Sequence, residues 1–342
     1  MWTYLELFTT EAYAKERLSA MHKDLKQDDL ETRAFWIGSC IRQAREYYHA
    51  ASSVSMLTKP LLLYYGMYSL AKAFIFLYNP MISLGAISHH GLVKPTIDYR
   101  AERLLEANTK SCRGIFRQLS KYALTNRCVI RGSEAYYLST TTDVSFPFNC
   151  CFTELSEARI FTLEELLMTL PELFEFLLEV GIENRELLKV DIDLYRNISG
   201  NWLRTLAIYK PRNKATTKSF LQNKFPEINS PRERIKEDDQ CFVFQRSLHD
   251  DYSTLIPRPL VQASSGQLFL ILNDSPISDI NVHFAVMFLL SNIVRYKPPL
   301  WQQIIETTQK SVISKFLSIS ELKFPNLILN ELLQRSFVFV KE

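Results

Sequence analysis

The stretch PLLLYYGMYSLAKAFIFLYNP, residues 60–80, decides the fold of this chain because it is apolar along its whole length. Its only formal charge is Lys72. Pro60 suits the first turn of a helix, where an N–H group is not needed, and Thr58 can cap that turn. The Asn-Pro pair that closes the stretch marks the end of the helix.

The same stretch has to be distinguished from a membrane span, which needs about 20 largely uncharged apolar residues. Three tyrosines, one serine and Lys72 place polar atoms in its middle. A charged side chain at the centre of a bilayer costs roughly 3 kcal/mol. We therefore predict a helix that is buried on nearly all sides in a large soluble domain, with no membrane partner.

Length and composition set the broad class of the protein. The 342 residues suffice for one large unit or two closely packed ones. Hydrophobic residues make up 47% of the chain and aromatic residues 12%, which excludes a chain disordered by composition. The net charge of +3 is too small to indicate nucleic-acid binding by itself. The N-terminal sequence MWTYLELF lacks the features of a secretory signal, so we expect a cytoplasmic location.

Cysteine and glycine spacing predicts neither a metal nor a cofactor. The six cysteines contain no C-x-x-C pair, and the adjacent Cys150 and Cys151 cannot face one tetrahedral ion without strain. The nine glycines form neither G-x-x-x-x-G-K-[ST] nor G-x-G-x-x-G. We therefore expect buried free thiols, no metal site and no nucleotide cofactor.

Helical periodicity dominates both ends of the chain, and strand-like alternation lies in its middle. The predicted fold class is α+β, predominantly α-helical, with N- and C-terminal helices packed around a small mid-chain antiparallel sheet. The predicted helices are 11–25, 31–52, 60–78, 114–124, 163–181 with a break at Pro171, 280–296, 300–317 and 324–337. The predicted strands are 103–109 and two hairpins, 187–195 with 202–210 and 241–247 with 267–272.

These elements predict three parts in one compact unit: an N-terminal helical part, 1–130, a mixed α/β part, 131–275, and a C-terminal helical part, 276–342. The middle part contains a basic insertion, 204–239. Within it, residues 211–239 are polar and carry three prolines, so we interpret them as a long surface insertion.

Six basic residues without an intervening acid lie in this insertion, and Tyr209 and Phe220 are interleaved with them. Such a surface attracts phosphate backbones, and its aromatic rings can stack on exposed bases. We predict binding of nucleic acid, either RNA or single-stranded DNA, and a solvated charged face is the structural alternative. The six residues are Arg204, Lys210, Arg212, Lys214, Lys218 and Lys224.

An enzymatic alternative rests on the predicted helix 31–52. Arg42 and His49 fit the signature of HEPN-type ribonucleases, an arginine followed after four to six residues by a histidine, and they share one helical face. There the imidazole can act as general acid or base, and the guanidinium can hold the phosphate. Arg17 and His22 match the signature too, so the pattern alone does not decide.

Two further features are open to a structural or a functional interpretation. His89 and His90 lie in the loop 79–95 and can supply a ligand or a general base, or cap the backbone. No acid stands at metal-ligand spacing beside them. Arg295 ends a hydrophobic helix, where it interacts favourably with the helix dipole and can stack on Trp301, so we expect a structural role for it.

Several motifs in order along the chain resemble the YaaC-like family of bacterial proteins. They are WTYL, SVSMLTKPLLLYYGMYSLAKAFIF, HGL, FTLEELLMTLPEL, LLSNIVRYKPPLW and FPNLILNELLQRSF. The resemblance spans nearly the whole chain and implies a bacterial, cytoplasmic, mostly helical protein. It implies no reaction, cofactor or catalytic residue.

These observations favour a non-enzymatic binding or accessory subunit that engages nucleic acid or a partner protein, including a second copy of the chain. The HEPN-type metal-independent ribonuclease with Arg42 and His49 is the alternative. A subunit of a larger assembly, such as a phage-defence system, is a third interpretation.

Overall fold

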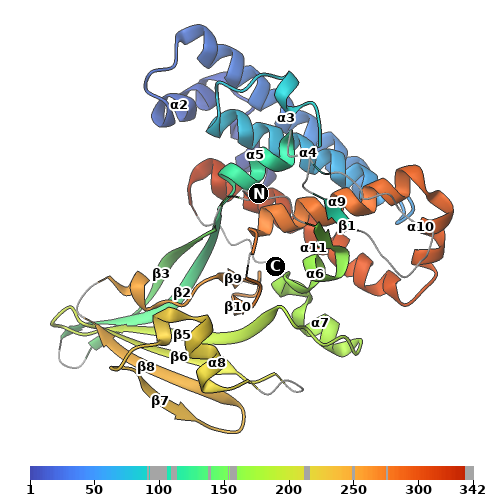
Figure 1. Cartoon of the computed structure of the whole chain (residues 1–342). Coiled ribbons are helices and arrows are strands. Elements are labelled where there is room, and N and C mark those ends of the chain that lie inside the picture. Colours follow the sequence, from blue (N-terminus) through green and yellow to red (C-terminus); the bar gives the residue numbers. More distant parts are fainter. Residues whose placement is uncertain are drawn as a thin grey trace. The chain divides into compact units, whose positions relative to one another are not determined.

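Figure 1 shows the computed structural model of the chain, which describes residues 1–90, 92, 106–108, 114–137, 140–152, 154, 160–211, 216–248, 251–274 and 276–335. The chain divides into two units. The helical unit comprises Met1–Leu124, Thr153–Leu167 and Ile277–Glu342, and the sheet unit comprises Thr125–Phe152 and Met168–Pro276. The α+β class with a predominance of helices is confirmed.

Helices from the two ends of the chain share the helical unit. Its described helices are α1 (Trp2–Leu7), α2 (Glu11–Met21), α3 (Gln27–Ser52), α4 (Lys59–Tyr78), α5 (Ile115–Tyr122), α6 (Leu163–Met168, ending at the boundary), α9 (Asp279–Tyr296), α10 (Pro298–Ile305) and α11 (Gln309–Leu333), with the short 3-10 helix η1 (Gly85–Ile87). A short antiparallel pair, β1 (Glu106–Asn108) and β4 (Ile160–Thr162), completes it. The predicted strand 103–109 is described only where it forms β1.

The predicted apolar helix is the centre of this unit. α3, α5, α9 and α11 all pack against α4. Pro60 lies in its first turn, and Thr58 is its N-cap residue, although the Thr58 side chain makes no capping hydrogen bond. Among the described helices, α4 is the one long and apolar enough to cross a membrane, and 67% of its most apolar window is buried. Core helices of soluble proteins meet the same conditions of length and composition.

A glycine allows α3 and α4 to approach each other closely. A Cβ atom added at Gly66 of α4 would lie 2.6 Å from the ring of Tyr48 on α3. Tyr48 is 5% exposed, so its ring has little room to move away. The close packing of these two helices therefore depends on the missing side chain at position 66.

The C-terminal helices divide at a different place from the prediction. The predicted helix 300–317 is interrupted between α10 and α11, whereas α11 continues through Pro325 to Leu333. A proline inside a helix costs about 3 kcal/mol. Phe324, Ile328 and Leu329, which lie next to Pro325 and in the turn after it, are fully buried. The free energy of this packing outweighs the local cost of the proline.

The predicted break in 163–181 is confirmed. α6 is followed by the 3-10 helix η2 (Pro171–Leu173) and by α7 (Phe174–Glu179). Thr162 and Glu165 form a reciprocal capping box: Thr162 Oγ1 accepts the Glu165 N–H at 3.1 Å, and Glu165 Oε2 accepts the Thr162 N–H at 2.8 Å.

The sheet unit is larger than predicted and is mixed. Its strand order is β3-β2-β5-β6-β8-β7, and β10 pairs with β5 and β9. The β2–β5 pair is parallel and the other pairs are antiparallel. The strands are β2 (Thr125–Tyr137), β3 (Thr140–Cys151), β5 (Leu187–Arg196), β6 (Trp202–Tyr209), β7 (Arg234–Glu237), β8 (Cys241–Leu248), β9 (Leu260–Gln262) and β10 (Leu268–Ile271).

One of the two predicted hairpins is correct. β5 and β6 pair as expected, whereas the predicted pairing of 241–247 with 267–272 is wrong, because β8 pairs with β6 and β7 and β10 pairs with β5 and β9. β7 ends only a short turn before β8 begins, so it is the nearest strand along the chain with which β8 can pair. Alternation identifies a strand but not its neighbour, so the pairing was not readable from the sequence.

The longest hairpin, β2 with β3, was not predicted. Its signal is nevertheless present, since Phe146, Phe148 and Cys150 are buried in alternation with exposed neighbours. Pro147 obscures that signal, but a proline is tolerated in an edge strand, and β3 lies at the edge of the sheet. Gly132 allows β2 to lie against β5, because an added Cβ would lie 2.2 Å from the Leu194 carbonyl oxygen.

The segment interpreted as a surface insertion contributes to the core of the sheet unit. Its described part contains α8 (Lys218–Lys224), the 3-10 helix η3 (Pro226–Ile228) and β7. Leu221, Phe225 and Ile228 are fully buried in the same hydrophobic cluster as the strands. Apolar residues spaced three or four apart were the missed signal.

Candidate functional site

The basic insertion does not present its first residue to solvent. Arg204 lies on the inward face of β6, and its side chain is fully buried. One guanidinium nitrogen donates to the Leu255 carbonyl oxygen at 2.6 Å, and another forms an ion pair with Glu233. Arg204 therefore belongs to the interior of the sheet unit, and we leave it out of any binding surface.

Two further lysines of the predicted surface are paired with acids. Lys210 Nζ lies 2.8 Å from a Glu237 carboxylate oxygen, and Lys224 forms an ion pair with Asp274. Lys218 is exposed at the start of α8. Arg212 and Lys214 lie outside the described residues. Within the described chain, the predicted surface thus retains little unpaired positive charge.

The ribonuclease candidates lie on the exposed face of α3. Arg42 donates to the Thr9 carbonyl oxygen at 3.1 Å and to Ser39 Oγ at 3.3 Å, and His49 is exposed in the last turn of the helix. The predicted placement on one helical face follows from the observed helix. Catalysis by this pair stays a prediction.

The loop histidines lie at the start of α5. The carbonyl oxygens of His89 and His90 accept the backbone N–H groups of Ile115 and Phe116 at 3.0 and 3.1 Å. These contacts fix the loop on the first turn of α5, which begins after Gly114 with its positive φ of 104°. His89 is exposed, whereas His90 is partly buried and its ring lies against α4.

Two tyrosines of α4 hold this loop. The Tyr64 hydroxyl lies 2.5 Å from His90 Nδ1. The Tyr68 hydroxyl donates to the carbonyl oxygens of Ile87 and Ser88 at 3.0 and 3.2 Å. The His90 ring is therefore anchored through its own side chain and through the backbone of His90 and of the residues just before it.

Two cations lie beside tyrosines of the same helix. Lys72 Nζ lies 4.4 Å from the centroid of the Tyr68 ring, and Arg295, at the end of α9, donates to the Tyr65 hydroxyl at 2.9 Å. Tyr65, Tyr68 and Lys72 are partly exposed in the middle of a helix that is otherwise exposed mainly at its two ends. We call the six residues the α4 cationic cluster: Tyr64, Tyr65, Tyr68, Lys72, His90 and Arg295.

Positive charges act on one another in this cluster. Burial lowers the pKa of His90, and the charges of Arg295, Lys72 and His89 lower it further. Burial also lowers the pKa of Lys72, opposed by Cys40. In the part of the chain that the structure describes, no carboxylate pairs with Lys72, His90 or Arg295.

Several other cations of the helical unit have acidic partners. Lys15 pairs with Glu11 and Glu31 at 2.6 and 3.0 Å. Arg45 pairs with Glu6, Lys59 with Glu321 at 2.6 Å, and the buried Lys323 with Asp279 at 2.7 Å. Arg17, Arg33 and Arg42 contact backbone carbonyl oxygens instead. The α4 cationic cluster differs from all of these because Arg295 and Lys72 both act on His90. Its chemistry suits an anion with several acceptor oxygens.

The sequence contained part of this site. His90 was a candidate, but Lys72 was noted only as a charge in an apolar helix, and Arg295 was assigned to a stack on Trp301. Arg295 contacts Tyr65 and Tyr296 instead, while the buried Trp301 donates its indole N–H to the Met56 carbonyl oxygen at 3.2 Å. The Tyr-x-x-Tyr-x-x-x-Lys spacing on α4 was the available signal.

Metal chemistry has no candidate site in the described chain, where no group of three or more His, Cys, Asp or Glu residues is placed to hold an ion. The described cysteines Cys40, Cys128, Cys150, Cys151 and Cys241 are free thiols.

Fold and site together define a two-unit α+β protein in which a largely buried, tyrosine-rich helix carries Lys72 on a partly exposed side, where the described chain brings no carboxylate to it. The chain belongs to the YaaC-like protein family, whose model matches residues 4–332. No curated protein and no solved structure matches the chain. The resemblance found in the sequence is thereby confirmed, and the function of this family member has to be argued from the site.

Proposed function

We propose that this YaaC-like protein binds a phosphate-bearing ligand at the α4 cationic cluster, with RNA or single-stranded DNA as the first source of phosphate to test. The observation that carries the proposal is the convergence of Lys72, His90 and Arg295 without a carboxylate partner among the described residues. This replaces the basic insertion as the proposed contact surface, because Arg204 is buried and Lys210 and Lys224 are paired.

Lys72 and His90 are partly buried, whereas Arg295 is exposed, and the partial burial makes the cluster a stronger anion site than a fully solvated lysine patch. Charges that are partly removed from water interact more strongly with a ligand and are screened less by salt. Arg295 offers a planar fork of donors, Lys72 a compact point charge, and His90 a ring nitrogen. Hydrogen bonds from such groups to phosphate oxygens are charge-assisted and about twice as strong as neutral ones.

The test is a binding titration with labelled single-stranded RNA and DNA at about 50 mM and about 200 mM salt, with ATP and inorganic pyrophosphate as competitors. The variants are Lys72→Gln and Arg295→Gln. Lys15→Gln is the matched control, because it removes one charge from the same unit at a lysine that has acidic partners.

We expect each cluster variant to weaken binding by about tenfold, equivalent to about 1.4 kcal/mol, and to reduce the salt slope for a single strand by about 0.7. Lys15→Gln is expected to change neither. Competition by pyrophosphate alone would identify a small phosphate ligand. No binding of any probe, or equal binding by all variants, would refute the proposal and direct the search to a protein partner or a second copy of the chain.

The Arg42–His49 ribonuclease is a second candidate, supported by the exposure of both residues on one face of α3. The same RNA titration, scored for cleavage, tests it with His49→Ala. Cleavage that His49→Ala abolishes and Lys72→Gln leaves unchanged would place the chemistry on α3 and separate it from the binding site on α4.

A further inference from the structure

We infer that Tyr64 is a positioning residue that holds His90 in the tautomer with its proton on Nε2, so that the α4 cationic cluster accepts oxyanions in preference to metal cations. The selectivity rests on the proposed function, whereas the tautomer is a property of the protein without ligand. The two parts can therefore be tested separately.

The direction of the Tyr64–His90 hydrogen bond follows from the burial of Tyr64. Its side chain is only 3% exposed, and burial raises the pKa of its hydroxyl well above the ordinary value, so the phenol keeps its proton. Within the described chain, His90 Nδ1 at 2.5 Å is the acceptor that the structure provides. A buried hydroxyl without an acceptor is costly, so Tyr64 donates and Nδ1 accepts.

The proton of the neutral ring then lies on the other nitrogen. The positive charges of Arg295, Lys72 and His89 oppose a second proton on His90, and burial acts in the same direction. A neutral imidazole has one donor and one acceptor nitrogen. Because Nδ1 accepts from Tyr64, Nε2 carries the hydrogen.

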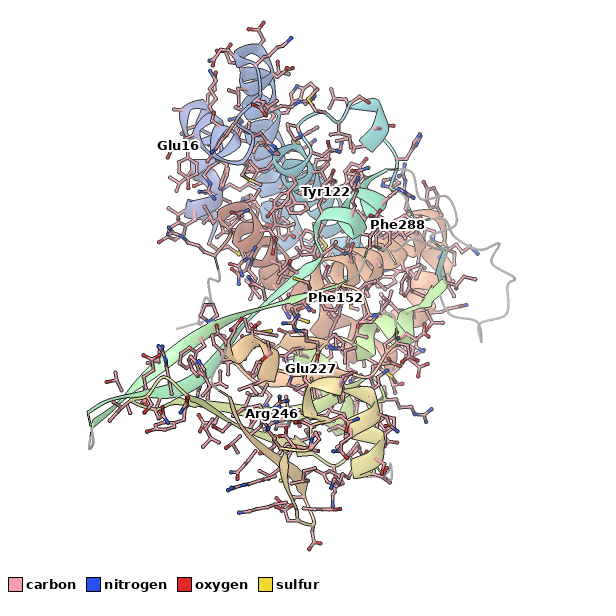
Figure 2. The ribbon with its side chains drawn as sticks, turned by 60° about the vertical axis from the view of Figure 1, so that its left-hand side comes forward. Glu16, Tyr122, Phe152, Glu227, Arg246 and Phe288 are labelled. Carbon is pink, nitrogen blue, oxygen red and sulfur yellow. The ribbon has the colours of Figure 1, made fainter. Side chains whose placement is uncertain are left out.

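The surroundings support this orientation of the ring. The His90 carbonyl oxygen accepts the Phe116 N–H at 3.1 Å, which fixes the backbone. The ring lies 5.1 Å from the Tyr68 ring and 6.0 Å from the Phe288 ring, measured between centroids. Phe288 on α9 is labelled in Figure 2.

This tautomer determines which ligands His90 can bind. A metal ion needs the lone pair of a ring nitrogen, but the Nδ1 lone pair is occupied by Tyr64 and Nε2 carries a proton. A phosphate oxygen needs a donor, which Nε2–H provides beside the charges of Lys72 and Arg295. The cluster is thus arranged for an oxyanion.

The test is long-range ¹⁵N–¹H correlation NMR on the full chain labelled at histidine, without ligand, at about pH 8, where histidine is ordinarily neutral. His90→Gln assigns the His90 signal. We expect an unprotonated Nδ1 and a protonated Nε2 in the wild type. In Tyr64→Phe, which removes only the hydroxyl, we expect a mixture of tautomers.

The chain contains its own reference for this measurement. His22 Nε2 lies 2.7 Å from the Leu77 carbonyl oxygen, which requires a proton on that nitrogen, and Tyr64→Phe should leave the His22 signal unchanged. Tyr68→Phe controls for the loss of a hydroxyl that holds the same loop without touching the His90 nitrogen. It should leave the His90 tautomer as in the wild type.

A proton on Nδ1 in the wild type, or identical His90 signals in wild type and Tyr64→Phe, would overturn the inference. In the binding titration, Tyr64→Phe should weaken affinity for inorganic pyrophosphate by about fivefold, the loss typical of one hydrogen bond. It should also increase binding of Zn²⁺. An Nε2–H signal in a wild type that binds no anion would refute the proposed function and the selectivity while leaving the positioning role of Tyr64.

Discussion

Arginine has opposite surroundings in the two units of the molecule. Arg295 of the helical unit lies beside tyrosines, Lys72 and His90, without a carboxylate partner among the described residues. Arg204 of the sheet unit is fully buried and paired with Glu233. A buried charge whose partner is built into the fold serves the structure, whereas converging charges without such a partner are suited to a ligand.

The charges around Arg204 in the sheet unit are balanced. Arg204 on β6 lies directly opposite Arg246 on β8, and like charges in that position repel. Glu233, just before β7, and Glu227, in η3, oppose this repulsion, and Arg246 donates to the Glu227 carbonyl oxygen at 3.5 Å. Figure 2 shows Glu227 and Arg246 among the side chains of this unit. Burial lowers the pKa of Arg204, and the charge of Glu233 opposes that shift.

The largest effect is expected from breaking the balanced pair. Glu233→Leu leaves Arg204 buried without its main partner. An arginine cannot lower the cost of its buried charge by losing its proton. We expect the free energy of unfolding to fall by about 3–5 kcal/mol, measured by urea denaturation.

The double variant Arg204→Met, Glu233→Leu is the control, because replacing a buried pair with apolar residues removes the uncompensated charge. It should recover most of the lost stability. A single variant that is as stable as the wild type would show that the pair is not a structural element of the sheet unit.

A smaller effect is expected from a buried histidine of the helical unit. Burial, and secondarily the charge of Lys323, lower the pKa of His283 well below its ordinary value. In the unfolded chain, where a histidine has a pKa near 6.5, His283 then binds a proton that it does not bind in the folded chain. Stability is therefore complete above about pH 6.5 and should fall by about 1.4 kcal/mol per pH unit below it, until the folded pKa is reached.

Urea denaturation at several pH values between about 7.5 and 5.5 measures this slope. His283→Gln should flatten it, even if the lost contact of His283 Nδ1 with Ser320 Oγ, 2.7 Å long, lowers stability at every pH. An unchanged slope in the variant would assign the acid sensitivity to other groups, including His90, whose pKa is lowered in the same direction.

The smallest effect is expected from the unpaired cation itself. Lys72→Gln removes repulsion from His90 and Arg295 together with a cation–π contact to Tyr68. The free energy of unfolding should therefore change by no more than about 0.5 kcal/mol. The pKa of His90 should rise toward its ordinary value, because one of the charges that lower it is gone.

Lys323→Gln is the matched comparison, since Lys323 is a buried lysine of the same unit that is paired with Asp279 at 2.7 Å. It should be strongly destabilising, because a buried carboxylate loses its ion-pair partner. Equal effects of the two lysine variants would remove the distinction between structural and ligand-directed charges on which the comparison rests.

Prediction from the sequence was most successful where a local pattern is sufficient. The bounds of α4 and α9 follow from apolar runs, proline positions and cap residues. The hairpin of β5 and β6 follows from alternation around a polar turn. The pairing of β8 and the continuation of α11 through Pro325 were not predicted, because distant packing outweighs the local signal there.

The candidate site shows the same division. His90 was singled out because a loop histidine is chemically versatile, and Arg42 with His49 because of their spacing. The basic insertion had the right composition, but the fold pairs its cations with acids far along the chain: Glu233 is 29 residues from Arg204, and Asp274 is 50 residues from Lys224. Composition counts charges and cannot show which of them are paired.

The sequence by itself determined that a long apolar helix with one charge forms the centre of a helical unit, because burying such a helix is the main way to remove its surface from water. Only the tertiary structure decided that His90 and Arg295 lie in the same cluster as Lys72. It brings His90 from a loop to Tyr64, 26 residues away, and Arg295 from the end of α9 to Tyr65, 230 residues away. Electrostatic interactions depend on distance in space, which the order of residues does not contain.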